Sequence, residues 1–444
     1  METTRRNFIK TAALGTAGLM LGGAKLSAKS YKRIIGANDR IHVGVMGLGR
    51  RLEAFYEPLT IEKSNVELMY LCDVLKRKRE EAGAAFSEKG LSPKLINDYR
   101  QMLDDKKVDA VINATPDHWH APGSIYALQA GKHVYVEKPC SHNMNENELL
   151  VAASQKYDRH VQMGNQQRSS DHTIQIIDEI HQGLIGTPYR AVAFYNNGRG
   201  EVPLQQAAPV PDGLDWDLFQ GPAPRRDYTS ETWNYNWHWY GWDYGTAELG
   251  NNATHELDVA RWALQVEFPH HVDVIASKSA FKDDGWEMYD QMEAIFSFEK
   301  DKTITWDGKS RNAYSTYGAG RGTIIYGSEG TVFVDRGKYE VFDRKGKMIR
   351  NRNSASQEGG LALGGGGDMS TIHVCNFFDT IRGTASLQAP IDDASRSMAM
   401  VHYGNAAYRA GHGFDVDPST GKMLDSKAME YWGRTYAKGW DLKI

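Results

Sequence analysis

The chain has 444 residues, enough for two domains that each bury a hydrophobic core. Charged residues make up 24% and hydrophobic residues 41%, which is typical of a globular protein, and a formal net charge of -4 gives no reason to expect nucleic-acid binding. Three cysteines, Cys72, Cys140 and Cys375, are too few and odd in number for a disulfide framework, and no CxxC pair predicts a zinc site.

The first residues predict an export signal. Arg5 and Arg6 precede Phe8 and Lys10, and a small, apolar run over residues 11–23 follows that is too short for stable membrane insertion. Paired arginines in this context are typical of the twin-arginine route. We therefore expect residues 1–35 to be a signal peptide and linker, and the mature protein to be periplasmic. A frayed basic amphipathic helix is the alternative.

A glycine turn after the first strand predicts a dinucleotide site. The apolar run 41–46 leads into Gly47, Leu48 and Gly49 and then into a helix-compatible segment. Gly47 permits a tight turn, and Gly49 lets the backbone approach a pyrophosphate at a helix N-terminus. Leu52 stands where a third glycine is usual, so the fingerprint is incomplete.

The second predicted strand, over residues 63–73, ends in Asp73. An acidic residue about 20 positions after the glycine turn can accept hydrogen bonds from an adenosine ribose. Its carboxylate repels a 2′-phosphate, which favours NAD. The basic residues that follow, Lys76, Arg77 and Lys78, leave NADP as an alternative.

Strand and helix patterns alternate over residues 36–165 and predict a doubly wound parallel sheet, hence an α/β Rossmann domain. Longer β-type runs then predict an α+β domain over residues 166–410 with a large, open, mostly antiparallel sheet. We expect residues 411–444 to form a C-terminal tail. The glycine-rich stretch 354–368 indicates a mobile loop.

Two motifs follow neighbouring strands of the first domain, at the edge where open α/β sheets bind ligands. Glu137, Lys138 and Pro139 end one strand, and a lysine there can take part in deprotonating a substrate hydroxyl. The other motif, residues 115–120, ends the preceding strand. The residues expected to contact the cofactor are Thr115, Pro116, His118, His120 and, from the first motif, Glu137. A metal site at the two histidines is the alternative; we predict none, because no third ligand is near in sequence.

The second domain carries the predicted substrate contacts. His255 begins a predicted helix, where an imidazole near Lys138 could exchange a proton with a hydroxyl, although a structural role is the alternative. Arg168 stands where the second domain begins and could face the cleft. Aromatic side chains crowd residues 233–244, and their faces can stack on pyranose rings, unless the loop packs on itself. Those expected to bind sugar are Trp237, Trp239 and Tyr240.

These motifs, in this order, make the chain resemble the Gfo/Idh/MocA (glucose–fructose oxidoreductase / inositol dehydrogenase) family over roughly residues 41–410. The resemblance implies a Rossmann domain, an open-sheet domain, NAD or NADP, and sugar or polyol substrates. Lys138 matches the family's catalytic lysine and His255 its catalytic histidine. Many members have an aspartate four residues before that histidine. Here the residue is Asn251, which cannot titrate and is expected to orient substrate.

We therefore expect an enzyme with tightly bound NAD that oxidises a ring hydroxyl of a sugar or glycoside, at carbon-3. A glycosidase that oxidises, eliminates, hydrates and reduces with a recycled cofactor is the alternative, and a non-catalytic sugar sensor is a third reading. The open sheet offers a face for self-association, so we expect a homodimer or homotetramer.

Overall fold

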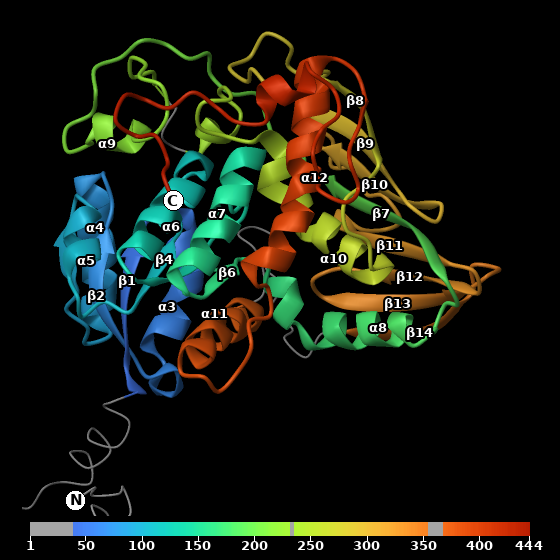
Figure 1. The fold of residues 1–444 in the computed structure, drawn as a ribbon, viewed down its shortest axis with the longest axis horizontal. Helices are drawn as coiled ribbons and strands as arrows, with labels where there is room; N and C mark the ends of the chain where they lie inside the picture. The colour runs from blue at the N-terminus through green and yellow to red at the C-terminus, as the bar shows by residue number, and fades with distance from the viewer. Residues whose placement is uncertain (1–38, 231–234, 354–366) are drawn as a thin grey trace, which may run out of the picture. The chain divides into compact units, whose positions relative to one another are not determined.

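The computed structural model describes residues 39–230, 235–353 and 367–444. Within the unit that starts at Ile41, one domain is built on a six-stranded sheet and another on a nine-stranded sheet (Figure 1). The predicted signal peptide and residues 354–366 of the predicted mobile loop lie outside the described residues. Export therefore stays a prediction.

The first sheet has the strand order β3-β2-β1-β4-β5-β6, and its described pairs are all parallel. Its central strands are buried on both faces, as with Val43 and Val45 of β1, because helices cover both sides. The predicted doubly wound sheet is confirmed. The strands are β1 (Ile41–Met46), β2 (Val66–Cys72), β3 (Lys94–Ile96), β4 (Ala110–Asn113), β5 (His133–Val136) and β6 (Val161–Met163); the helices are α3 (Glu53–Thr60), α4 (Lys76–Glu88), α5 (Arg100–Asp104), α6 (Asp117–Gln129) and α7 (Met144–Tyr157).

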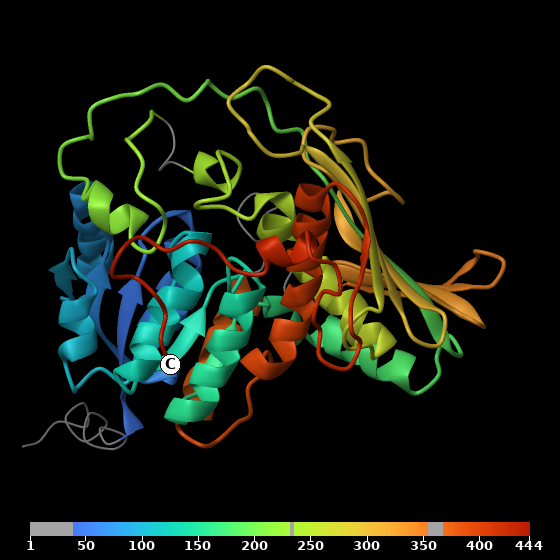
Figure 2. The ribbon, with the colours of Figure 1, turned by 45° about the horizontal axis from the view of Figure 1, so that its top comes forward.

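The second sheet has the order β14-β13-β12-β11-β7-β10-β9-β8-β15, and among its described pairs only β7 with β10 is parallel. The predicted large, mostly antiparallel sheet is confirmed. Helices α8, α10 and α12 pack on one face (Figure 2). The strands are β7 (Pro188–Asn196), β8 (His271–Ser277), β9 (Gln291–Phe298), β10 (Lys302–Lys309), β11 (Arg321–Gly327), β12 (Gly330–Val334), β13 (Lys338–Asp343), β14 (Met348–Asn353) and β15 (Phe414–Asp415); the helices are α8 (Asp171–His181), α9 (Trp216–Gln220), α10 (Thr254–Leu264), α11 (Gly367–Ile381) and α12 (Ile391–Ala410).

Alternation along β9 explains the two faces of this sheet. Met292 and Phe296 are buried against the helices, whereas Ile295 points the other way and is 38% exposed. Ile275 of β8, on the same outer face, is 79% exposed. The expected homodimer or homotetramer, built on this face, stays a prediction. Among the described helices, none combines the length and the apolar character needed to cross a bilayer.

Segments from the end of the chain return to the first domain. Helix α11 packs on α3, and its Phe377 and Phe378 join the core that contains β1. In the C-terminal tail, Arg434 pairs with buried Glu146 of α7, and Trp440 packs edge-on against Trp119 of α6. The tail therefore holds α6, the helix that follows the Thr115–His120 motif.

Candidate active site

A cavity of about 440 Å³ lies at the carboxyl ends of β1, β2, β4 and β5, where the strand order of the first sheet reverses. This is the position at which open α/β sheets bind ligands. Residues of the second domain close it from the other side. Of the predicted site residues, those that line it are Gly47, Gly49, Asp73, Thr115, Pro116, His120, Glu137, Lys138, Trp237, Asn251 and His255.

The two glycines of the turn have different physical roles. Gly47 has a φ of +90°, and a Cβ there would lie 2.5 Å from the Ala114 carbonyl oxygen, so the fold itself requires glycine. A Cβ on Gly49 would meet nothing within 4 Å and would enter the open cavity. Gly49 therefore leaves room for a ligand, as the pyrophosphate of a dinucleotide needs. Leu52, in place of a third glycine, is buried in the core.

Asp73 connects the glycine turn to the end of β2. Its carboxylate accepts hydrogen bonds from the backbone N–H groups of Leu48 and Leu75, each at 2.8 Å. Burial raises the pKa of Asp73, and these two backbone donors oppose that rise. A carboxylate has about four acceptor positions, so a ribose hydroxyl can still bind. Lys78 also lines the cavity nearby, which keeps the NADP alternative open.

Lys138 lines the cavity. Its ammonium donates to the backbone carbonyl of Asn251, which ties the end of β5 to the second domain. Burial lowers the pKa of Lys138 to about 8, although the charges of Glu137 and Asp117 oppose the change. An amine with this pKa exchanges protons near neutral pH.

The carboxylate of Glu137 is buried, and the charge of a neighbouring arginine balances it. It accepts from Arg51 Nε at 2.7 Å and from Gln166 Nε2 at 3.2 Å. A Cβ on Gly164 would approach it to 2.9 Å, so glycine at that position makes room for the carboxylate. Glu137 is thus held beside Lys138 in the cavity wall, and its contact with a cofactor stays a prediction.

His255 and Asn251 come from a distorted helix start. Leu249–Ala253 form a π-helical turn, a distortion that often marks functional sites, directly before α10. Asn251 Nδ2 lies 3.4 Å from the Tyr235 hydroxyl and 3.4 Å from Glu248 Oε1. The His255 ring has no hydrogen bond to any described residue, and burial, followed by the charge of Arg336, holds its pKa well below the ordinary value. His255 is therefore neutral.

Sequence reasoning did not select Asp117, the first residue of α6, which lines the cavity and is 1% exposed. Its carboxyl accepts from the hydroxyl and backbone N–H of Thr246 at 2.5 and 3.2 Å, and its Oδ2 lies 3.9 Å from His238 Nδ1. Burial raises the pKa of Asp117 to about 7. Asp117 stands between Pro116 and His118 of the predicted motif, but its burial against Thr246, 129 positions away, could not be predicted from the local sequence.

His118, predicted to contact the cofactor, does not line the cavity. α6 turns this face toward α9, where the His118 Nε2 bonds the Phe219 carbonyl at 2.8 Å, and burial lowers the pKa of His118 to about 3. His120 faces the cavity and donates from Nδ1 to the Pro139 carbonyl at 2.5 Å. Within the described residues, no group of three or more histidine, cysteine or acidic side chains is arranged to hold a metal ion.

Some residues of the aromatic segment line the cavity, and others are buried in the protein interior. Trp237 lines the cavity with Tyr235, whose ring lies 4.5 Å below the Arg50 guanidinium. Trp239 and Tyr240 were also predicted to bind sugar, but both are buried outside the cavity: Trp239 stacks on Trp286 at 4.4 Å, and the Tyr240 hydroxyl donates to the Pro203 carbonyl at 2.8 Å. The self-packed alternative therefore holds for Trp239 and Tyr240, whereas sugar binding by Trp237 stays a prediction. Trp233 lies outside the described residues.

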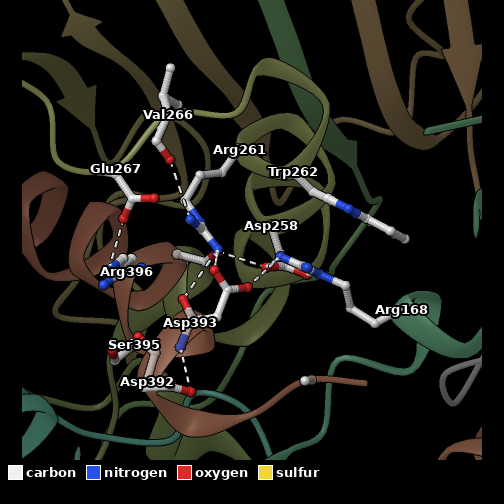
Figure 3. Close-up of polar contacts among 12 residues, drawn as sticks. Arg168, Asp258, Arg261, Trp262, Val266, Glu267, Asp392, Asp393, Ser395 and Arg396 are labelled. Carbon is white, nitrogen blue, oxygen red and sulfur yellow. Dashed lines mark hydrogen bonds and ion pairs between the residues drawn. The ribbon is translucent and has the colours of Figure 1, made fainter. Parts of the chain in front are cut away.

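Arg168, predicted to face the cleft, lies in a buried ionic network instead (Figure 3). Its guanidinium donates twice to Asp258 of α10, at 2.7 and 2.8 Å, and lies 3.1 Å from Asp393 of α12. Arg261 also pairs with Asp393. The network joins α10 and α12 to the segment after β6, and so positions the helix that carries His255.

The fold and the cavity together define a two-domain dinucleotide-binding protein. Residues 41–165 match the NAD-binding Rossmann fold of the Gfo/Idh/MocA oxidoreductase family, and residues 180–336 match its C-terminal alpha/beta domain. The chain belongs to the Gfo/Idh/MocA oxidoreductase family.

Individual relatives are distant. A glycosyl hydrolase family 109 protein of Shewanella baltica is 28% identical over 216 residues, covering 43% of this chain and 45% of the relative. An alpha-N-acetylgalactosaminidase of Shewanella oneidensis is 27% identical with the same coverage. The chain thus spans about half the length of the curated relatives it matches. The WlbA dehydrogenase from Bordetella pertussis, solved with NADH and UDP-GlcNAcA, shares the fold, with a TM-score of 0.63, 18% identity and coverage of 85% of this chain and 98% of that one.

The two glycines give a test of the cofactor cradle. We expect Gly49→Ala to leave the melting temperature unchanged, because its methyl group meets open space, but to weaken NAD binding by about tenfold or more by filling the cradle. Gly47→Ala is the contrasting variant and should lower the melting temperature, because of its φ and its clash with Ala114. Thermal unfolding and NAD titration of the ligand-free protein measure both. Unchanged NAD affinity in Gly49→Ala would place the pyrophosphate elsewhere.

The ionic network gives a test of stability. Asp258→Asn preserves shape but leaves two buried guanidinium groups with less negative charge, so we expect a loss of about 3 kcal/mol in the free energy of unfolding. Glu80→Gln, at an exposed pair with Lys76, is the control and should change little. Urea denaturation followed by tryptophan fluorescence compares them. Equal stability of the two variants would contradict a structural role for the network.

Proposed function

We propose that the protein is an NAD-dependent oxidoreductase that oxidises a ring hydroxyl of a sugar or glycoside, with carbon-3 as the expected position. The observation that carries the proposal is the convergence of Lys138 and His255 on the cavity that the glycine turn also lines. The aromatic wall of Tyr235 and Trp237 offers the faces on which a pyranose ring packs.

In this proposal Lys138 removes the proton of the reacting hydroxyl. With a pKa of about 8, part of the lysine population is neutral at physiological pH and can accept a proton. The neutral His255 ring accepts a hydrogen bond from the same hydroxyl and orients it. The Asn251 backbone carbonyl fixes the direction of the amine. The Asn251 side-chain nitrogen donates to Tyr235 and Glu248, so the side-chain oxygen is left to accept from a neighbouring substrate hydroxyl.

The residues of the first domain fit tightly bound NAD. Gly49 leaves space for the pyrophosphate, Asp73 offers acceptor positions to the ribose, and Glu137 lies beside Lys138. Bound NAD would supply the acceptor for the hydride that leaves the ring carbon as Lys138 takes the proton. The Asp73 carboxylate disfavours a 2′-phosphate, so NAD is proposed ahead of NADP.

A glycosidase that recycles NAD is the second candidate, favoured by the names of the curated relatives, a glycosyl hydrolase and an alpha-N-acetylgalactosaminidase. A ketone at carbon-3 acidifies the carbon-2 proton, so a base can remove it while the aglycone leaves from carbon-1. Water then adds, and the ketone is reduced again. Asp117, with a pKa raised to about 7, is a buried acid that could move a proton in these steps.

The two candidates differ in their products. Incubating the purified protein with a panel of aryl glycosides, without added cofactor, and analysing the mixture by mass spectrometry separates them. We expect a product that has lost two hydrogen atoms, in at most enzyme-equivalent amounts until an electron acceptor is added. Many turnovers to free aglycone and unoxidised sugar would instead support the glycosidase, and no product with either bound or added NAD would contradict both.

The pH dependence tests the role of Lys138. We expect kcat/KM for oxidation to rise with pH and level off above pH 8, because the base is the neutral amine and its pKa is lowered to about 8. Lys138→Ala should reduce kcat by about a hundredfold or more. Lys138→Arg keeps the charge but cannot deprotonate, so it should be as inactive. A pH profile that is unchanged in either variant would exclude Lys138 as the base.

A further inference from the structure

Arg336 differs from the other arginines around the inner end of the cavity. It lies in the turn between β12 and β13 and lines the cavity, yet it makes no hydrogen bond or ion pair with any described residue. Arg51 pairs with Glu137 at 2.7 Å, and Arg321 pairs with Glu256 at 2.7 Å. Arg199 pairs with Glu248 at 3.3 Å. Each of these three forms an ion pair with a carboxylate. Arg336 forms none with any described residue; the carboxylate of Glu256 is near enough for its charge to raise the pKa of Arg336, but it is paired with Arg321.

The charge of Arg336 affects the titratable groups around it. Burial, followed by the charge of Arg321, lowers the pKa of Arg336 itself to about 9. After burial, Arg336 is also the largest charge that lowers the pKa of His255, and it contributes to the lowered pKa of Lys138. Arg336 therefore adds positive charge at the end of the cavity that holds the proposed catalytic pair. A half-buried cation without an ion-pair partner of its own is poorly compensated, so a ligand that brings an anion gains binding energy there.

The position of Arg336 distinguishes between the anions that could fill this role. The cofactor cradle lies at Gly47 and Gly49 after β1, and the ribose position lies at Asp73 after β2. Arg336 instead belongs to the second domain, and it lies near enough to His255 and Lys138, the groups proposed to touch the substrate, for its charge to lower their pKa values. The counter-charge is therefore expected on the sugar.

We propose that Arg336 binds a carboxylate of the sugar, so that the substrates are hexuronic acids or hexuronides rather than neutral hexosides. The guanidinium presents two parallel N–H donors that match the two oxygens of a carboxylate. This proposal rests on the proposed function, because it assigns the substrate class to the same cavity.

The experiment compares matched substrates and matched variants of the full chain with bound NAD. Aryl glucuronides and galacturonides are paired with the glucosides and galactosides that differ only at carbon-6. We expect kcat/KM for one uronide to exceed that of its neutral partner by about tenfold or more. Arg336→Gln should remove this preference mainly by raising KM, and Arg336→Lys should retain part of it. Arg344→Gln, at an exposed arginine after β13, is the control and should retain all of it.

Binding measurements separate the possible failures. Calorimetry with free glucuronate and galacturonate should detect binding that Arg336→Gln loses, while its NAD affinity stays within about twofold. An equal loss of NAD affinity would assign the anion to the cofactor and overturn the proposal. Preference for a sulfated sugar over the uronate, or for the neutral sugar, would overturn it as well. Uronate binding that depends on Arg336 without any turnover would support the subsite and contradict the proposed oxidation.

Discussion

The arrangement of the site depends on the buried ionic network of Arg168, Asp258, Arg261 and Asp393. Lys138 and Glu137 follow β5 of the first domain, whereas His255 starts α10 of the second. These side chains can share a cavity only if α10 keeps its position relative to β5. Asp258, three residues beyond His255 on the same helix, is fixed by two hydrogen bonds from Arg168, in the segment that follows β6. Directional ion pairs of this kind define one geometry where apolar packing alone would tolerate several.

Burial sets the protonation states around this geometry. His118, His120 and His255 all have lowered pKa values, because a charged imidazole is poorly solvated in the interior. Lowered pKa values favour the neutral ring, and two of these rings, His118 and His120, bond backbone carbonyls. The groups that change charge near neutrality are Lys138 and Asp117, whose pKa values approach 7 to 8 from opposite directions. Proton transfer in the cavity is therefore expected to run through an amine and a carboxyl group.

Much of the fold could be predicted because its signals are local. Local patterns identify several elements. Gly47 with its positive φ marks the turn, the apolar run of β1 marks a strand buried on both faces, and the alternation along β9 marks a strand with one exposed face. The site was predictable where it follows strand ends, as at Asp73 and Lys138. It was not predictable where the direction of a side chain depends on a distant partner. Arg168 pairs with Asp258, 90 positions away, instead of lining the cavity, and Trp239 stacks on Trp286 in the interior. No local sequence pattern marks Arg336, because what distinguishes it is that it forms no ion pair with any described residue.

Tyr235 shows how the two ends of the cavity are joined. The Arg50 guanidinium, directly after the glycine turn, lies 4.5 Å over its ring, and the Arg199 guanidinium lies 5.8 Å from the ring centre. The Tyr235 hydroxyl lies 3.4 Å from the amide of Asn251, whose carbonyl accepts from Lys138. A continuous series of contacts thus runs from the turn suited to a pyrophosphate, through one aromatic ring of the predicted sugar-binding segment, to the lysine amine. Because the cavity is built from both domains along this series, the glycine turn and the aromatic wall form one structural unit.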